Sequence, residues 1–224
     1  MGDAIGQVLS LGVGVAISPV PIIAVVLMLG TPRARVNGPA FVAGWVAGLA
    51  LVGTIVLLIA GGADANAAGE PATWVSVLKL VLGALLVVLA GRQWRHRPRG
   101  GAQGDLPRWM ASIDRFTVGR SAAMAAALAA VNPKNLLLTV SAAAAIAQVG
   151  AGAGGEVVAM AVFVLVATLG PGIPVGIYFA TGARAERLLG ELKAWMKANN
   201  TTIMAILCLV IGAKLLGDGV SGLT

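Results

Sequence analysis

The chain has 224 residues, of which 58% are hydrophobic and only 11% are charged, and its mean hydropathy is +0.91. Soluble domains carry about a quarter charged residues, so this composition excludes an ordinary soluble domain and indicates an integral membrane protein. The net charge of +7 would also suit a nucleic-acid-binding protein. The positions of the basic residues along the chain distinguish that explanation from membrane topology. The single cysteine, Cys208, excludes an intramolecular disulfide and a thiolate metal cluster.

Six apolar runs are long enough to cross a bilayer, since a crossing helix needs about 20 apolar residues. In chain order they cover residues 7–30, 38–61, 73–91, 119–147, 157–181 and 199–217. Prolines interrupt the first, fourth and fifth runs, at Pro19 and Pro21, at Pro133, and at Pro171 and Pro174. We therefore expect an all-α integral membrane protein with six transmembrane helices.

The basic residues predict the orientation. Of the 16 Lys and Arg residues, 13 lie in the segments 31–37, 92–120 and 182–198, whereas 62–72 and 148–156 hold none. Because cytoplasmic loops collect Lys and Arg, we expect these three segments in the cytoplasm and both termini outside a bacterial inner membrane. This placement accounts for the net charge, so nucleic acid is not an expected partner.

Two of the basic segments contain amphipathic stretches. In residues 105–116, Asp105 can cap a helix with Pro107 in its first turn, and the apolar face holds Leu106, Trp109, Met110 and Ile113. In residues 183–200, helical spacing relates Leu188, Leu192, Trp195 and Met196. Both stretches suit helices lying on the inner membrane surface, and equally suit connectors packed on the protein itself. Residues 92–104 are expected to form a basic loop with no metal site.

The chain also shows an internal correspondence. Subtracting 114 from the numbers of Asn132–Asn135 gives Ser18–Pro21, and the second and third runs then correspond to the fifth and sixth. Three crossings are an odd number, so the second half enters the membrane from the opposite side. We expect two inverted three-helix repeats, residues 1–91 and 119–224, with broken first and fourth helices and a basic linker at 92–118. Matched interruptions of this kind mark the substrate sites of transporters.

The interrupted helices supply the candidate site. Pro19 and Pro21 leave two carbonyls of the first run without their usual donors, and Pro133 does the same for Ala129. Short polar residues can cap the broken ends, and helix N-termini favour an anion. Lys134 adds a full positive charge at membrane depth. The candidate substrate-binding residues are Ser18, Pro19, Pro21, Asn132, Pro133, Lys134 and Asn135.

A third interruption is expected at GPGIP, residues 170–174, where Pro171 frees the carbonyl of Ala167. Pro171 and Thr168 join the candidate substrate-binding residues, and Tyr178 is a further candidate for lining a path. The second run instead carries GWVAG, whose glycines, Gly44 and Gly48, have a spacing typical of close helix packing.

The sequence lacks the residues that several classes of protein need for their function. No Asp or Glu lies in the centre of any run, whereas proton-coupled pumps need an intramembrane carboxylate or histidine relay. The sequence also shows no Ser/His/Asp set and no phosphate-binding glycine loop. We therefore expect neither an enzyme nor a bound cofactor or metal.

With SPVPI in its first helix, NPKN in its fourth and two inverted triplets, the chain resembles the lysine-exporter superfamily. Over its whole length it is most similar to the actinobacterial sulfolipid- and glycopeptidolipid-addressing proteins. This resemblance implies export of a cell-envelope lipid or glycolipid across the inner membrane, along a path flanked by the two motifs. The amino-acid-exporting relatives carry a PGP-like element in the first helix, and SPVP replaces it here, which argues against a small amino-acid substrate.

Three functions remain open at this stage: a lipid transporter for an anionic head group, a small-solute exporter, and an assembly partner that docks a lipid synthase through the basic loops. A lateral opening at the level of Lys134 would favour the first function, and a sealed cavity the second. The corresponding partners are membrane lipids, an anionic lipid or glycolipid substrate, lipid-synthesis proteins and further copies of the chain.

Overall fold

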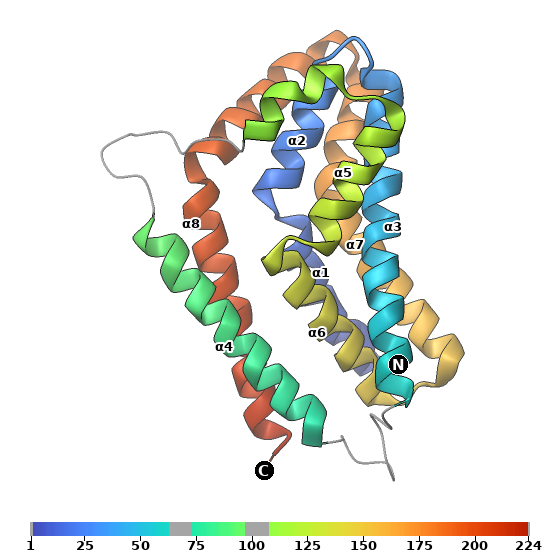
Figure 1. Ribbon diagram of the computed structural model, residues 1–224, viewed down its shortest axis with the longest axis vertical. Coiled ribbons are helices and arrows are strands. Elements are labelled where there is room, and N and C mark those ends of the chain that lie inside the picture. The colour runs from blue at the N-terminus through green and yellow to red at the C-terminus, as the bar shows by residue number, and fades with distance from the viewer. Residues whose placement is uncertain (1, 63–72, 97–107, 224) are drawn as a thin grey trace.

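The computed structural model describes residues 2–62, 73–96 and 108–223, and none of these residues lies in a β-strand (Figure 1). The elements are α1 (Gly2–Ala16), α2 (Pro19–Leu29), α3 (Ala34–Gly62), α4 (Thr73–Arg95), the 3-10 helix η2 (Arg108–Arg115), α5 (Val118–Ala130), α6 (Pro133–Val149), α7 (Gly152–Thr181) and α8 (Ala183–Ser221). The prediction of an all-helical protein is confirmed for the described residues.

The helices provide four to six candidate membrane spans. Four of them, α3, α4, α7 and α8, are each long and apolar enough to cross a bilayer. The pairs α1–α2 and α5–α6 pass the same test only as pairs, bent by 49° and 67° at their breaks. The predicted breaks in the first and fourth runs are therefore confirmed, and each bent pair is either a broken span or a re-entrant loop.

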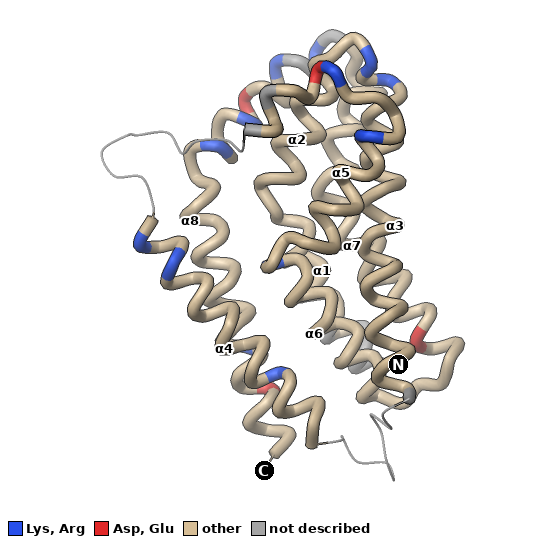
Figure 2. The backbone as a smooth tube through the Cα atoms, in the orientation of Figure 1, with Lys and Arg blue, Asp and Glu red and all other residues tan. Residues whose placement is uncertain are grey.

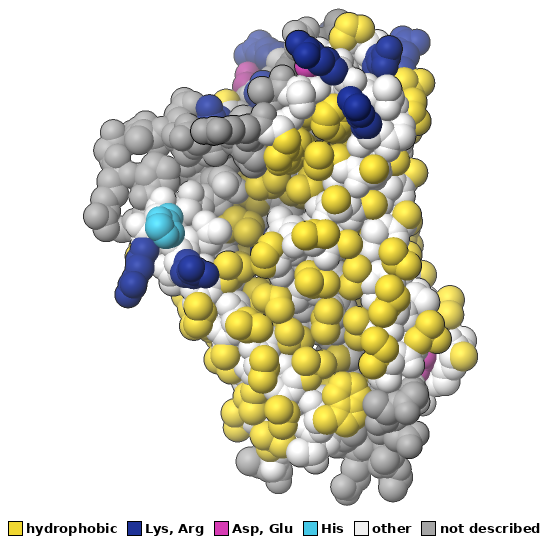
Figure 3. Space-filling view, viewed as in Figure 1, with side chains coloured by type: hydrophobic (Ala, Val, Ile, Leu, Met, Phe, Trp, Pro, Cys, Tyr) yellow, Lys and Arg dark blue, Asp and Glu magenta, His cyan; other side chains and the backbone are white. Residues whose placement is uncertain are grey.

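The helices lie side by side, with both chain ends at one end of the molecule (Figure 1). The pair α4–α8 packs together along one flank, while α3 packs on α5 and α1 packs on α7. Lys and Arg gather mainly at the end opposite the termini, which we call the basic end (Figure 2). Between the two ends, hydrophobic side chains cover the visible face, as a surface in contact with lipid requires (Figure 3).

Glycines bring helix backbones into direct contact at several places, two of which concern the predicted motifs. A Cβ atom on Gly44 would lie 2.0 Å from the carbonyl oxygen of Ala122, and one on Gly48 would lie 2.7 Å from that of Ala126. The prediction that GWVAG marks close packing is thus confirmed, and its partner is α5. On the other side of the molecule, a Cβ on Gly170 would lie 2.1 Å from the carbonyl oxygen of Ala16, at the end of α1.

The interruption expected at GPGIP is wrong, because α7 continues as one helix through Pro171 and Pro174. Pro171 still removes the N–H that would bond the carbonyl of Ala167. The indole Nε1 of Trp45, a residue of α3 with 0% exposure, donates to that oxygen at 3.3 Å. A proline inside a membrane helix is tolerated when a neighbouring helix re-satisfies the freed carbonyl, and α3 does so here.

The segment around η2 packs on the protein itself. Met110, Ile113 and Phe116 are buried, and their spacing of three residues matches the period of a 3-10 helix. The amide of Asn37 donates to the carbonyl oxygen of Phe116 at 2.9 Å and ties the segment to α3. These contacts favour the packed connector over a membrane-surface helix. Asp105, Leu106 and Pro107 lie outside the described residues, as does most of the 92–104 stretch.

The second amphipathic stretch and the sixth run form one continuous helix, α8. Of the predicted apolar face, Met196 is buried together with its neighbour Leu189, whereas Leu188 and Trp195 are 50% and 58% exposed. One side of this stretch thus packs on the protein, while Leu188 and Trp195 stay available for contact with a membrane surface.

A double-mutant cycle can test whether Trp45 supplies the hydrogen-bond donor that Pro171 lacks. Trp45→Phe keeps an aromatic ring but removes the N–H, and we expect it to lower the free energy of unfolding by about 1 kcal/mol. In a Pro171→Ala background, the new N–H of residue 171 can bond the carbonyl of Ala167, so the same substitution should cost less. Reversible unfolding in detergent micelles measures the four proteins of the cycle.

Pro174→Ala is the matched control, because it restores a donor for the carbonyl of Gly170, which Trp45 does not contact. Trp45→Phe should cost as much in that background as in the parent protein. Equal costs in all three backgrounds would show that the Trp45–Ala167 hydrogen bond adds nothing to stability.

Candidate functional site

The two helix breaks meet inside the protein. Ser18, the residue before α2, is 1% exposed, and its hydroxyl donates to Oδ1 of Asn135 at 2.7 Å. Asn135 lies in the first turn of α6 and is 0% exposed. The structure therefore brings together the SPVP and NPKN motifs, which are more than a hundred residues apart in the chain.

Lys134 connects the same two breaks. Its side chain is 1% exposed, and its ammonium donates to the carbonyl oxygen of Gly14 at 2.7 Å. Because α1 ends at Ala16, Gly14 contributes one of the last carbonyls of the helix, which lack partners within it. A cation is favoured at this position, since the helix dipole is negative at its C-terminus. The lysine thus places a buried charge against the end of α1.

Gly14 is a contact residue that the sequence did not indicate. A Cβ on Gly14 would lie 2.4 Å from Cδ1 of Ile211 in α8 and 3.1 Å from Cδ1 of Leu138 in α6. The absence of a side chain therefore lets α1 approach both helices and brings its last carbonyls within reach of Lys134. In a sequence with 31 glycines, no local signal distinguishes this one.

The asparagines cap the broken ends, as predicted. Oδ1 of Asn132 accepts from the backbone N–H of Lys134 at 3.1 Å and so caps the N-terminus of α6. Nδ2 of Asn135 donates to the carbonyl oxygen of Leu128 at 3.2 Å, near the end of α5. The cap predicted for Ser18 is wrong, because its hydroxyl is committed to Asn135 and makes no hydrogen bond to the α2 backbone.

The three prolines of the motifs lie in the first turns of α2 and α6. Pro19 and Pro21 are buried at the start of α2, and Pro133 is the first residue of α6. Proline is tolerated at the beginning of a helix, where its missing N–H would have no helical partner. These prolines therefore separate two pairs of half-helices, and both breaks contribute to the polar cluster of Ser18, Lys134 and Asn135.

The two candidates from α7, Thr168 and Pro171, are not members of this polar cluster. The hydroxyl of Thr168 donates at 2.6 Å to the carbonyl oxygen of Val164, on its own helix. Pro171 is buried beside Gly170, the residue that approaches the end of α1. The structure thus places Pro171 next to the α1 break, while the hydroxyl of Thr168 is satisfied within α7.

The polar cluster carries an excess of positive charge. Within the described residues the ion pairs are Arg187–Glu191 and Lys214–Asp218, so Lys134 has no carboxylate partner there. An ammonium group has three N–H donors, and the bond to Gly14 uses one of them. The N-termini of α2 and α6 point their partial positive charges at the same region. The arrangement suits an anion better than a cation.

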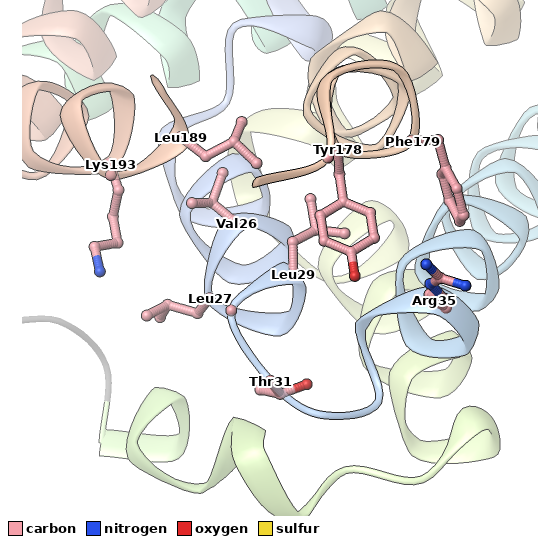
Figure 4. A pocket seen from close by; sticks show the side chains of 12 residues that line it. Val26, Leu27, Leu29, Thr31, Arg35, Tyr178, Phe179, Leu189 and Lys193 are labelled. Atoms are coloured by element: carbon pink, nitrogen blue, oxygen red, sulfur yellow. The ribbon is translucent and has the colours of Figure 1, made fainter. Parts of the chain in front are cut away.

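The structure has two hollows to consider, and Lys134 lines neither. The first, which we call the basic-end cavity, has a volume of about 980 Å³ between the end of α2, the start of α3, the end of α7 and the start of α8 (Figure 4). It contains Tyr178, which the sequence suggested for a path, and Arg35 and Lys193, which served there only to predict orientation.

The second hollow, which we call the lateral groove, has a volume of about 310 Å³ between α4 and the α5–α6 break. Its wall on α5 and α6 includes Pro133, which directly precedes Lys134 in the chain. The complete lining is Leu85, Val88, Leu89, Arg92, Val131, Pro133, Leu136 and Leu137.

Sequence reasoning also missed Lys79, which lies in α4 within the third apolar run. Its side chain is 5% exposed and donates to Oε1 of Gln148, in the last turn of α6. A lysine in an apolar run was a visible signal, but its partner depends on the packing of α4 beside α6.

One of the comparisons with known proteins identifies a family. A family model described as "Sap, sulfolipid-1-addressing protein" matches residues 8–221. No curated protein and no solved structure matches the chain. The match covers nearly the whole sequence, and the chain therefore belongs to the sulfolipid-1-addressing protein family.

Proposed function

We propose that this protein exports or flips a cell-envelope lipid or glycolipid with an anionic head group across the bacterial inner membrane. The observation that carries the proposal is the lateral groove, which opens between α4 and the α5–α6 break. Membership of the sulfolipid-1-addressing family supports a lipid substrate. A small-solute exporter would need an enclosed site, and an assembly partner would need no groove.

The groove has the chemistry of an acyl-chain site. Seven of its eight lining residues are apolar, and the remaining one, Arg92, lies in the last turn of α4. Val88 and Val131, on opposite walls, are 60% and 71% exposed, so the rim faces the surroundings of the helices. A lipid can keep its tails in the bilayer, lay part of one chain in this groove and hold its head group toward Arg92.

Lys134 is the proposed intramembrane contact for the head group. Without substrate its charge is stabilised by the carbonyl of Gly14. A passing sulfate, phosphate or carboxylate would compete with this carbonyl, because a hydrogen bond between two charged groups is stronger than one to a neutral carbonyl. Binding would then remove a cap from α1 and couple the substrate to the helix break. Asn132, Asn135 and Ser18 complete the polar surroundings.

The helix pairing supports the proposed inverted repeat and, with it, the resemblance to the lysine-exporter superfamily. If α1–α2 correspond to α5–α6, α3 to α7 and α4 to α8, then the pair α3–α5 corresponds to α7–α1, and both pairs pack closely. Likewise α2–α8 corresponds to α6–α4, and both are in contact. The two bent pairs also run in opposite directions (Figure 1).

The proposed orientation, with the basic end in the cytoplasm, can be tested by cysteine labelling. Gly154 and Gly119 lie in the first turns of α7 and α5, and a Cβ at either position meets nothing within 4 Å. In a Cys208→Ser background, an impermeant maleimide should label Gly154→Cys in intact cells and Gly119→Cys only after lysis. Labelling of Gly119→Cys alone in intact cells would reverse the orientation.

The lateral groove predicts an effect of filling it. In a strain that lacks the native protein, Val88→Trp should lower the amount of exported lipid at the cell surface by at least about tenfold, because a bulky ring displaces the chain from the groove. Val81→Trp is the matched control, since Val81 is 50% exposed on the same helix and lies outside the groove. Lipid profiling of surface and interior fractions provides the measurement. Equal effects of the two substitutions would remove the groove from the path.

Lys134 gives a separate prediction in the same lipid assay. Lys134→Met should insert well, because it removes a charged side chain from membrane depth, which costs up to about 3 kcal/mol on insertion scales. It should nevertheless abolish export, whereas Lys134→Arg should keep part of it. Normal export by a well-expressed Lys134→Met protein would show that the lysine only caps α1.

A further inference from the structure

The basic-end cavity has a mixed lining that none of the preceding steps uses. One wall is the end of α2, with Val26, Leu27 and Leu29, and Leu189 of α8 extends it. Figure 4 shows the guanidinium of Arg35 and the ammonium of Lys193 on opposite sides of this apolar wall. The volume, about 980 Å³, lies within the range of sites that bind small molecules, roughly 300–1,000 Å³.

The two cations have no carboxylate partner in the described part of the chain, where the ion pairs are Arg187–Glu191 and Lys214–Asp218. The hydroxyl of Tyr178 points into the space between Leu29 and Arg35 (Figure 4). The cavity therefore offers an ammonium, a guanidinium and a phenol hydroxyl as hydrogen-bond donors beside its apolar wall. A charged head group attached to an apolar body matches this combination.

We propose that the basic-end cavity binds the anionic head group of a membrane lipid, with the apolar part of the lipid against α2. This inference rests on the proposed function and assigns the position where the substrate is first held. The helix that forms the apolar wall is the one that begins at Ser18 and Pro19, so a lipid in the cavity lies on the same element as the polar cluster. A free anion would gain nothing from the apolar wall, which is why we assign a lipid.

The test uses the full-length protein in a neutral detergent and dioctanoyl phosphatidylglycerol as the anionic probe. Arg35→Gln and Lys193→Gln should each raise the dissociation constant by about tenfold, since each removes a charge-assisted contact. Arg33→Gln and Lys197→Gln are matched controls, because each residue is a close neighbour in sequence of Arg35 or Lys193 but does not line the cavity. Each control should stay within about twofold of the parent protein.

A further variant tests the space itself. Gly190 lines the cavity, and a Cβ at this position meets nothing within 4 Å, so Gly190→Phe should fold and fill the cavity. It should weaken binding of the probe by at least about tenfold, because the ring occupies the place of the lipid. Gly176→Phe is the control, since Gly176 is also unobstructed and lies outside the cavity.

Three outcomes would overturn the proposal. Equal affinity for dioctanoyl phosphatidylcholine would remove the preference for a net negative head group. Competition by inorganic phosphate at the same concentration would show a site for free anions. An equal loss of binding in the Arg33→Gln and Lys197→Gln controls would assign the effect to general surface charge.

Failure of this inference and failure of the proposed function give different results. Unchanged binding in the cavity variants, together with loss of surface lipid in the Val88→Trp strain, would refute only the cavity. Normal surface lipid in a strain without the protein would refute the transport function, whatever the binding assay shows.

Discussion

A backbone carbonyl without a partner costs several kcal/mol at membrane depth, and this constraint governs how the protein holds its interrupted helices. The two helix breaks leave the carbonyls of Gly14 and Leu128 without helical partners, and Pro171 within α7 does the same to the carbonyl of Ala167. Lys134, Asn135 and Trp45 supply the missing donors, respectively. None of these donors comes from the helix that lost its own N–H. Features that weaken single helices therefore become contacts between helices.

Two of these contacts also join the two halves of the chain. Lys134 of the second half caps α1 of the first, and Trp45 of the first half satisfies α7 of the second. The hydrogen bond from Ser18 to Asn135 also joins the first half of the chain to the second. The glycine contacts of α3 with α5 and of α7 with α1 add close backbone packing across the same boundary. By contrast, α4 and the α5–α6 break are separated by the lateral groove, which is why we place lipid access there.

The features that could be predicted from the sequence are those with a local signal. Hydropathy located the helices, and the prolines located both breaks, because length, apolarity and a missing N–H are properties of a short stretch. The asparagine caps followed from the same reasoning. It failed where a remote partner decides the outcome: α7 continues through GPGIP, and Trp45 takes the carbonyl that Pro171 frees. The partner of Lys134 could not be predicted either, since Gly14 differs from other glycines only by the helices that converge on it.

The two ends of the molecule differ, because the basic end holds a cavity and the end near the termini is packed. The proposed repeat makes the two ends comparable. It relates the walls of the basic-end cavity, from α2, α3, α7 and α8, to α6, α7, α3 and α4 at the end near the termini. There the helices are closed over a separate small core. Its members, from α3, α4 and α6, are Ala60, Val75, Ala144 and Ala147. Under the proposed repeat, corresponding positions are open at one end and packed at the other, and under the proposed transport function this difference would represent one of two alternating states.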